Sequence, residues 1–200
     1  MRRMAREAVI CDGGLPALVA IAHAAERWHL ERGSEPDQKP IVIGVCGAFE
    51  GAADPARVQA DLFSLDYAAL GSKTGVVRLV VAASLEASAQ GAGVLTWPVC
   101  LGEGSSAEEP LDRISQATDL ALLASRLVSL EAEGVGLVVE TPLVDLTDRQ
   151  VAELALDIDA PIETCAWWGR ENDPEHARWT RVLSALGWRR PRPLHAGGTR

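Results

Sequence analysis

Positive charge is scarce in this sequence. The 200 residues include 19 lysines and arginines against 28 aspartates and glutamates, which gives a formal net charge of −9 and a pI near 4.9. A protein that binds a nucleic-acid backbone needs surplus basic charge to displace phosphate counterions. We therefore expect no nucleic-acid partner. Lysine is scarcest, since Lys39 and Lys73 are the only two, so chemistry that needs a lysine beside a phosphate has two candidates.

Long apolar runs are also absent. No run reaches the roughly 18 residues that a membrane-spanning helix needs. The arginines near the start resemble the beginning of a signal peptide, but residues 11–14 interrupt the following stretch and no small-residue cleavage pattern is present. These features predict a cytoplasmic protein with no membrane partner.

Cysteine is sparse and scattered. The four cysteines stand at positions 11, 46, 100 and 165, and no two of them form a Cys-x-x-Cys pair. Such a pair is typical of zinc knuckles and thioredoxin-like sites, so neither is expected. Three of the four end apolar runs, which favours small buried thiols in a reducing compartment.

What the chain does contain is enough apolar sequence for a core, since 48% of its residues are hydrophobic. Short apolar runs alternate with helical patterns, and this alternation predicts βαβ units and a parallel sheet. We predict a Rossmann-like, three-layer α/β/α domain over residues 1–188, with four or five parallel strands and a frayed tail over 189–200. Strands are expected at 8–11, 41–46, 93–97 and 137–139, and helices at 15–32, 54–70, 76–90, 111–133, 147–157 and 174–186.

Ligands of such sheets bind at the carboxyl ends of the strands, near the point where the strand order reverses. This rule places residues 12–14, 47–50, 98–100 and 140–142 on one rim. Asp12, Gly13 and Gly14 follow the first strand, where glycines let backbone N–H groups approach a phosphate. A Gly-Gly turn is also common as a plain strand-to-helix connection.

A second informative segment lies late in the chain. Glu140, Thr141, Pro142 and Leu143 follow an apolar strand, a capped helix comes next, and residues 163–165 read Glu-Thr-Cys. With the early glycines, this block resembles the 7-cyano-7-deazaguanine synthases of the PP-loop, or N-type ATP pyrophosphatase, superfamily. The resemblance covers residues 8–168, and the late block is its more specific part. It implies the fold of the adenine nucleotide alpha hydrolase type.

The resemblance also implies a function. The family activates a carboxylate with ATP, lets ammonia displace the nucleotide, and after a second activation forms a nitrile in queuosine biosynthesis. ATP, Mg²⁺ and a deazapurine are then the implied ligands. Asp12, Gly13 and Gly14 would bind the nucleotide, while Glu140, Thr141, Pro142 and Lys73 would bind the substrate.

The departures from the family pattern concern the chemistry. Family loops read Ser-Gly-Gly-x-Asp-Ser, whereas here Asp12 replaces the first serine, Pro16 the aspartate and Ala17 the last serine. Cys165 is the only one of the family's four zinc-binding cysteines that is retained, so we expect the zinc site to be lost. The family's arginine-bearing central loop has no clear counterpart, and one strand of its sheet is expected to be missing.

Several residues have two interpretations. Arg113, Arg126 and Lys73 are candidate cations for a pyrophosphate, and Asp12 and Asp112 are candidate metal ligands. Glu140 could accept two N–H bonds from a guanine-like edge or could make a turn contact. The tryptophans at 167, 168, 179 and 188 could stack on a purine, although the favoured interpretation is that they cover a sheet edge.

Two main functions therefore stand open. The first is a divergent 7-cyano-7-deazaguanine synthase-like ligase with weak or lost catalysis. The second is a non-catalytic paralogue that binds a nucleotide or a partner subunit through the same rim. A third is a small α/β binding module that shares only the fold. A homodimer is compatible with all three.

Overall fold

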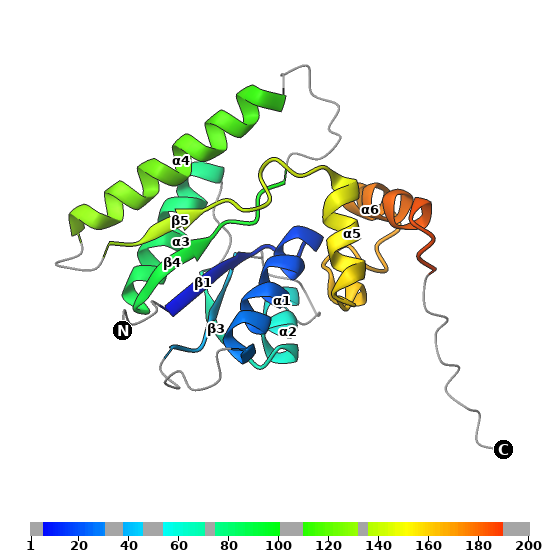
Figure 1. The fold of residues 1–200 in the computed structure, drawn as a ribbon, viewed down its shortest axis with the longest axis horizontal. Helices are drawn as coiled ribbons and strands as arrows, with labels where there is room; N and C mark the ends of the chain where they lie inside the picture. The colour runs from blue at the N-terminus through cyan, green and yellow to red at the C-terminus, as the bar shows by residue number, and fades with distance from the viewer. Residues whose placement is uncertain are drawn as a thin grey trace.

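β1 (Arg6–Cys11) is the central strand of a five-stranded, fully parallel sheet (Figure 1). The computed structural model describes residues 6–30, 38–45, 54–70, 75–100, 110–131 and 136–189. The strand order is β3-β2-β1-β4-β5, with every neighbouring pair parallel. The other strands are β2 (Ile41–Gly44), β3 (Asp66–Ala69), β4 (Ala92–Thr96) and β5 (Val138–Glu140).

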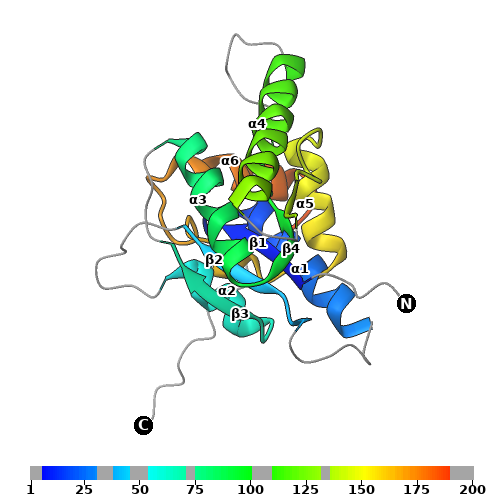
Figure 2. The same cartoon turned by 90° about the vertical axis from the view of Figure 1, so that its left-hand side faces the viewer.

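Helices cover both faces of this sheet (Figure 2). α1 (Leu15–Leu30) and α2 (Pro55–Leu62) lie on one face, and α3 (Val76–Ala89) and α4 (Pro110–Glu131) lie on the other. α5 (Asp148–Asp157) packs beside α1, and α6 (Pro174–Ala185) packs on α5 after a short 3-10 helix, η2 (Ile162–Thr164). The predicted three-layer α/β/α architecture is therefore confirmed.

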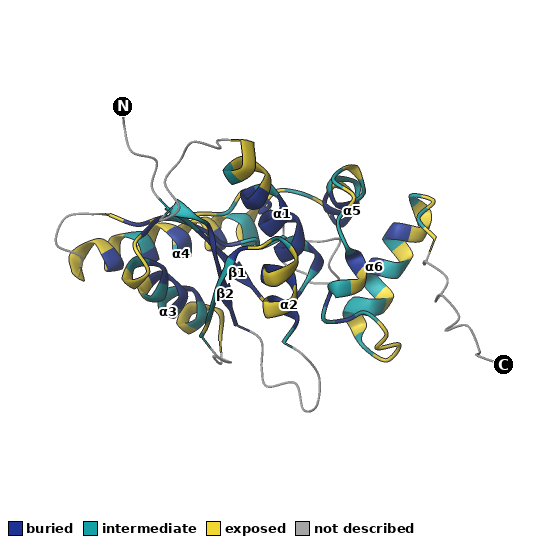
Figure 3. Ribbon diagram, turned by 90° about the horizontal axis from the view of Figure 1, so that it is seen from below, coloured by how far each residue is buried: buried dark blue, intermediate teal, exposed yellow. Residues whose placement is uncertain are grey.

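The side chains of β1 explain this layering. Ala8 and Ile10 belong to the core under α3 and α4, while Val9 and Cys11 belong to the core under α1 and α2. All four are buried, because a central parallel strand has no solvent-facing side. Figure 3 shows the same pattern in the buried residues of the sheet and the inner helix faces.

The prediction of one helix over residues 54–70 was wrong. The helix ends at Leu62, Ser64 adopts a positive φ of 55°, and β3 follows from Asp66. β3 is an edge strand whose residues are only partly buried, so its sequence lacks the β-branched run of a central strand. The strand expected to be missing is thus present, paired with β2.

The other predicted elements are found with small shifts at their ends. Asp54 caps α2 by accepting a hydrogen bond from the Ala56 N–H, and Pro55 occupies the first turn. Thr147 and Gln150 form a reciprocal capping box at the start of α5. Within the described ranges, no helix is both long enough and apolar enough to cross a membrane.

Candidate functional site

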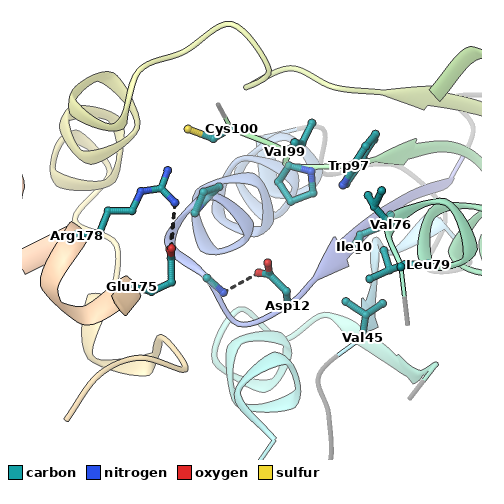
Figure 4. Close-up of a pocket in the computed structure, with 14 residues that line it drawn as sticks. Ile10, Asp12, Val45, Val76, Leu79, Trp97, Val99, Cys100, Glu175 and Arg178 are labelled. Atoms are coloured by element: carbon teal, nitrogen blue, oxygen red, sulfur yellow. Dashed lines mark hydrogen bonds and ion pairs between the residues drawn. The ribbon is translucent and has the colours of Figure 1, made fainter. Parts of the chain in front are cut away.

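A cavity of about 470 Å³ opens at the carboxyl ends of β1 and β4 (Figure 4). The strand order reverses between these two strands, since β1 continues through α1 to β2 on one side and β4 lies on the other. This is the place where parallel α/β sheets bind ligands. Its volume lies in the range of small-molecule sites. The lining residues come from the ends of β1, β2 and β4, from the first turn of α3 and from α6.

In the loop after β1, the carboxylate of Asp12 accepts a hydrogen bond from the backbone of the same loop. The Gly14 N–H donates a hydrogen bond to Oδ1 of Asp12 over 2.8 Å, and the Gly13 N–H faces Sγ of Cys11 at 3.4 Å. Pro16 has no N–H to offer in the first turn of α1. The Asp12 carboxylate therefore already accepts the Gly14 N–H, which is one of the donors that this loop could offer to a phosphate oxygen.

Asp12 lies at the mouth of the cavity and is reached by solvent there. Protein atoms nevertheless crowd its carboxyl group, and this loss of hydration raises the pKa of Asp12 above its ordinary value. The hydrogen bond from Gly14 opposes the rise, whereas the negative charge of Glu175 adds to it. Asp12 and Glu175 are thus two like charges that face the same space.

The early loop and the late Glu-Thr-Cys block meet in the fold. The Ala166 N–H donates to the Gly13 carbonyl over 2.8 Å, and Gln59 Nε2 donates to the Thr164 carbonyl over 3.3 Å. Gly13 has a φ of 80°, and a Cβ at this position would lie 2.9 Å from Cβ of Ala166. Glycine is required at position 13 by both its backbone conformation and this close approach.

Arg178 of α6 is the cation of the cavity wall. Its Nε donates to Oδ2 of Asp148 over 2.7 Å, its Nη2 pairs with Oδ1 of the same carboxylate, and its Nη1 pairs with Glu175. Asp148 is only 2% exposed, and its hydrogen bonds raise the pKa of the Arg178 guanidinium. Trp179 Nε1 donates to Glu175 over 2.8 Å, while the guanidinium lies over the Trp179 ring. Two carboxylates therefore already neutralise this arginine.

The opposite wall is apolar. Trp97, Pro98 and Val99 continue from β4 into the cavity lining, and Trp97 is largely buried. An indole here offers a flat surface for a planar ring. The side chains that complete this apolar wall are Ile10, Val45, Val76 and Leu79.

Sequence reasoning found part of this site. It placed residues 12–14 and 98–100 on the rim, and Asp12, Gly14 and residues 98–100 line the cavity. It missed Trp97, Glu175 and Arg178. No local signal could have found Arg178, because α6 reaches the cavity only through its packing on α5.

The other predicted site residues that the structure describes are not among those that line the cavity. Glu140 is an exposed residue at the end of the edge strand β5, and Thr141 and Pro142 form the turn that follows it. Arg113, Arg126 and Asp112 belong to α4. Lys73 and residues 47–50 lie outside the described residues.

Cys165 is buried, and burial raises the pKa of its thiol, with the charges of Asp12 and Glu163 raising it further. A thiol in this state is a poor nucleophile and a poor metal ligand. No three His, Cys, Asp or Glu side chains of the described residues cluster so as to hold a metal ion. Cys46 lies outside the described residues.

The four late tryptophans, Trp167, Trp168, Trp179 and Trp188, do not line the cavity and pack in the core between α1, α5 and α6. Trp167 and Trp179 are buried between α1, α5 and α6, and Trp168 meets Trp188 edge to face at 5.6 Å. Their apolar area is used to hold α6 against the rest of the domain. This packing carries Glu175 and Arg178 to the cavity.

Comparison with known proteins adds information about the fold. No protein-family model and no curated protein sequence matches this chain. Among solved structures, the chain is similar to the U34-tRNA thiolase NcsA from Methanococcus maripaludis, which was determined with its 4Fe-4S cluster. The TM-score is 0.50 at 16% sequence identity, and the match covers 98% of this chain and 77% of the thiolase. This likeness shows that the chain shares its α/β fold with that thiolase.

Proposed function

We propose that this chain is a divergent PP-loop protein that binds a purine or deazapurine nucleoside and has lost most or all ATP-dependent activation. The observation that carries the proposal is the hydrogen bond from the Gly14 N–H to the Asp12 carboxylate. An anion is built into the loop at the place where a nucleotide-activating protein of this fold would need to receive one.

The charges around the cavity support the same conclusion. Asp12 and Glu175 contribute two carboxylates to the lining, and Arg178 is already paired with Asp148 and Glu175. A phosphate placed about 4 Å from an ionised Asp12 would be repelled by roughly 1 to 4 kcal/mol, depending on the local dielectric. A neutral nucleoside meets no such penalty.

The apolar wall supports a planar base as the ligand. Trp97, Pro98 and Val99 lie opposite the charged groups, so a purine-like ring could stack on apolar surface while its polar edge meets Asp12 or Glu175. The deazapurine class rests on the resemblance of residues 140–143 and 163–165 to the synthases. Roles for Glu140, Thr141, Pro142 and Lys73 in base recognition remain predictions.

An activity assay tests the loss of catalysis. Wild-type protein would be incubated with ATP, Mg²⁺, ammonia and 7-carboxy-7-deazaguanine, and pyrophosphate and nitrile formation would be followed. We expect turnover at the limit of detection, since removal of a single stabilising donor typically costs about 10²–10³ in rate. The triple change Asp12→Ser, Pro16→Asp and Ala17→Ser restores the family loop and should bind ATP more tightly than the wild type.

A second function is favoured by one observation. Asp12 and Glu175 both face the cavity, and Mg²⁺ is commonly held by one or two carboxylates together with substrate phosphates. In an active enzyme these two side chains would hold the ion beside the nucleotide. Robust wild-type turnover that requires Mg²⁺ and is abolished by Asp12→Ala would establish this function and refute the first.

A further inference from the structure

The outer face of α4 is apolar where a solvent-facing helix is normally polar. The inner face buries Ala117, Ala121, Ala124 and Val128 against the sheet. The outer side nevertheless carries four leucines whose side chains are 49–84% exposed: Leu122, Leu123, Leu127 and Leu130.

Within the part of the chain that the structure describes, the position of α4 leaves this outer face open. α4 packs against α3 and β5 and runs along the outside of the molecule (Figures 1 and 2). No other described element makes an extensive contact with it. Its 22 residues correspond to a rod about 33 Å long, which is enough for a long helix-to-helix contact.

The charges on this face are arranged with two-fold complementarity. Asp119 and Arg126 are both exposed, and their separation of seven residues places them on the same side of the helix. The midpoint between them falls between Leu122 and Leu123. A second α4 laid antiparallel across that midpoint brings Asp119 opposite the partner's Arg126, and Arg126 opposite the partner's Asp119.

The same register also matches the apolar residues. Leu122 of each copy lies opposite the partner's Leu123 at the two-fold axis. One antiparallel arrangement therefore pairs opposite charges at two points and joins the leucines at the centre.

We propose that α4 is a dimerisation surface on which a second copy of this chain docks antiparallel, with the two-fold axis between Leu122 and Leu123. A two-fold interface uses the same patch twice, so self-complementary charge is its expected signature. The exposed leucines form an apolar patch on the order of 400 Å², about the largest that a monomeric protein exposes. Two such faces with their flanking residues reach the order of 1,000 Å² that a specific interface needs.

Sedimentation equilibrium of the full chain over a series of concentrations tests the proposal. We expect a reversible dimer of two 21.3 kDa chains. Leu123→Glu should weaken association by at least about tenfold, because it buries two unpaired carboxylates, one from each copy, at the axis. Leu62→Glu is the matched control: Leu62 is 53% exposed on α2, on the other face of the sheet, and its change should leave the dimer intact.

Charge exchange tests the register itself. Asp119→Arg and Arg126→Asp should each weaken the dimer by about tenfold, since each places like charges opposite one another twice. The double variant Asp119→Arg/Arg126→Asp restores both pairs with reversed polarity and should recover the dimer. A wild-type monomer at all concentrations, a dimer indifferent to Leu123→Glu, or a double variant as weak as the single variants would overturn the proposal.

Discussion

Arg178 Nε donates a hydrogen bond to Oδ2 of Asp148 over 2.7 Å, and this contact joins α6 to α5 beneath the cavity. Asp148 is 2% exposed, so its charge depends on Arg178 for compensation. Arg178→Met should lower the free energy of unfolding by about 3 kcal/mol, because it removes the cation that is paired with a buried carboxylate. Denaturant unfolding followed by circular dichroism measures this loss.

A double-mutant cycle separates the buried charge from the general loss of contacts. Asp148→Asn/Arg178→Met should be more stable than Arg178→Met alone, since the buried side chain at position 148 then carries no charge. The control is Arg149→Met on α5, the helix that carries Asp148. This change removes an exposed ion pair with Glu153 and should lower the free energy of unfolding by less than about 0.5 kcal/mol. Equal losses for Arg178→Met and Arg149→Met would contradict the assigned role.

Gly44 and Tyr67 are predicted to show coupled stability effects. A Cβ at Gly44 would lie 2.6 Å from the Tyr67 hydroxyl oxygen and 2.7 Å from the ring. The hydroxyl donates to Asp54, so the ring cannot move freely away. Gly44→Ala should therefore cost about 1–3 kcal/mol in thermal or denaturant unfolding. In a Tyr67→Ala background the same change should cost much less; additive effects would show that the contact does not restrict position 44.

Asp12 is predicted to reduce stability as the pH rises. Burial raises the pKa of Asp12 above its ordinary value of 3.8. The folded state then binds the proton more tightly than the unfolded state, so the free energy of unfolding falls as pH increases from 3.8 through the folded-state pKa. Asp12→Asn removes this loss, and its stability advantage over the wild type should grow between about pH 3 and pH 7.

The difference between the two proteins isolates Asp12 from other groups. Burial also raises the pKa of Glu7, which contributes a pH dependence of the same sign to both proteins. The free energy of unfolding should therefore be measured in urea at a series of pH values for the wild type and for Asp12→Asn. The informative quantity is the difference between the two proteins at each pH. A constant difference from pH 3 to pH 7 would mean that folding does not change the affinity of Asp12 for its proton.

The fold was largely predictable because the strong signals are local. The β-branched run at residues 41–46 and the capping residues Asp54 and Thr147 each fix an element without help from the rest of the chain. β3 was missed for the opposite reason. Its sequence, Asp-Tyr-Ala-Ala, has no strong preference for a strand, and pairing with β2 determines its conformation.

The site was only half predictable. Asp12 and Gly14 follow a strand directly, so the general rule for parallel sheets places them at the cavity. Glu175 and Arg178 belong to α6, which follows Asp12 by more than 150 residues. They reach the cavity because the buried Trp167 and Trp179 hold α6 against the domain. Contacts of this kind depend on the complete path of the backbone and leave no periodic pattern in the sequence.

Titration calorimetry with adenosine and ATP, without Mg²⁺, tests the central claim that Asp12 occupies the anion position of the loop. The account predicts that the wild type binds adenosine at least about tenfold more tightly than ATP, and that Asp12→Asn shifts this ratio toward ATP by about tenfold or more. Asp145→Asn, a change of an exposed aspartate outside the cavity lining, should leave the ratio unchanged. Tighter binding of ATP than of adenosine to the wild type, with no change in Asp12→Asn, would contradict the account, as would the binding of neither ligand.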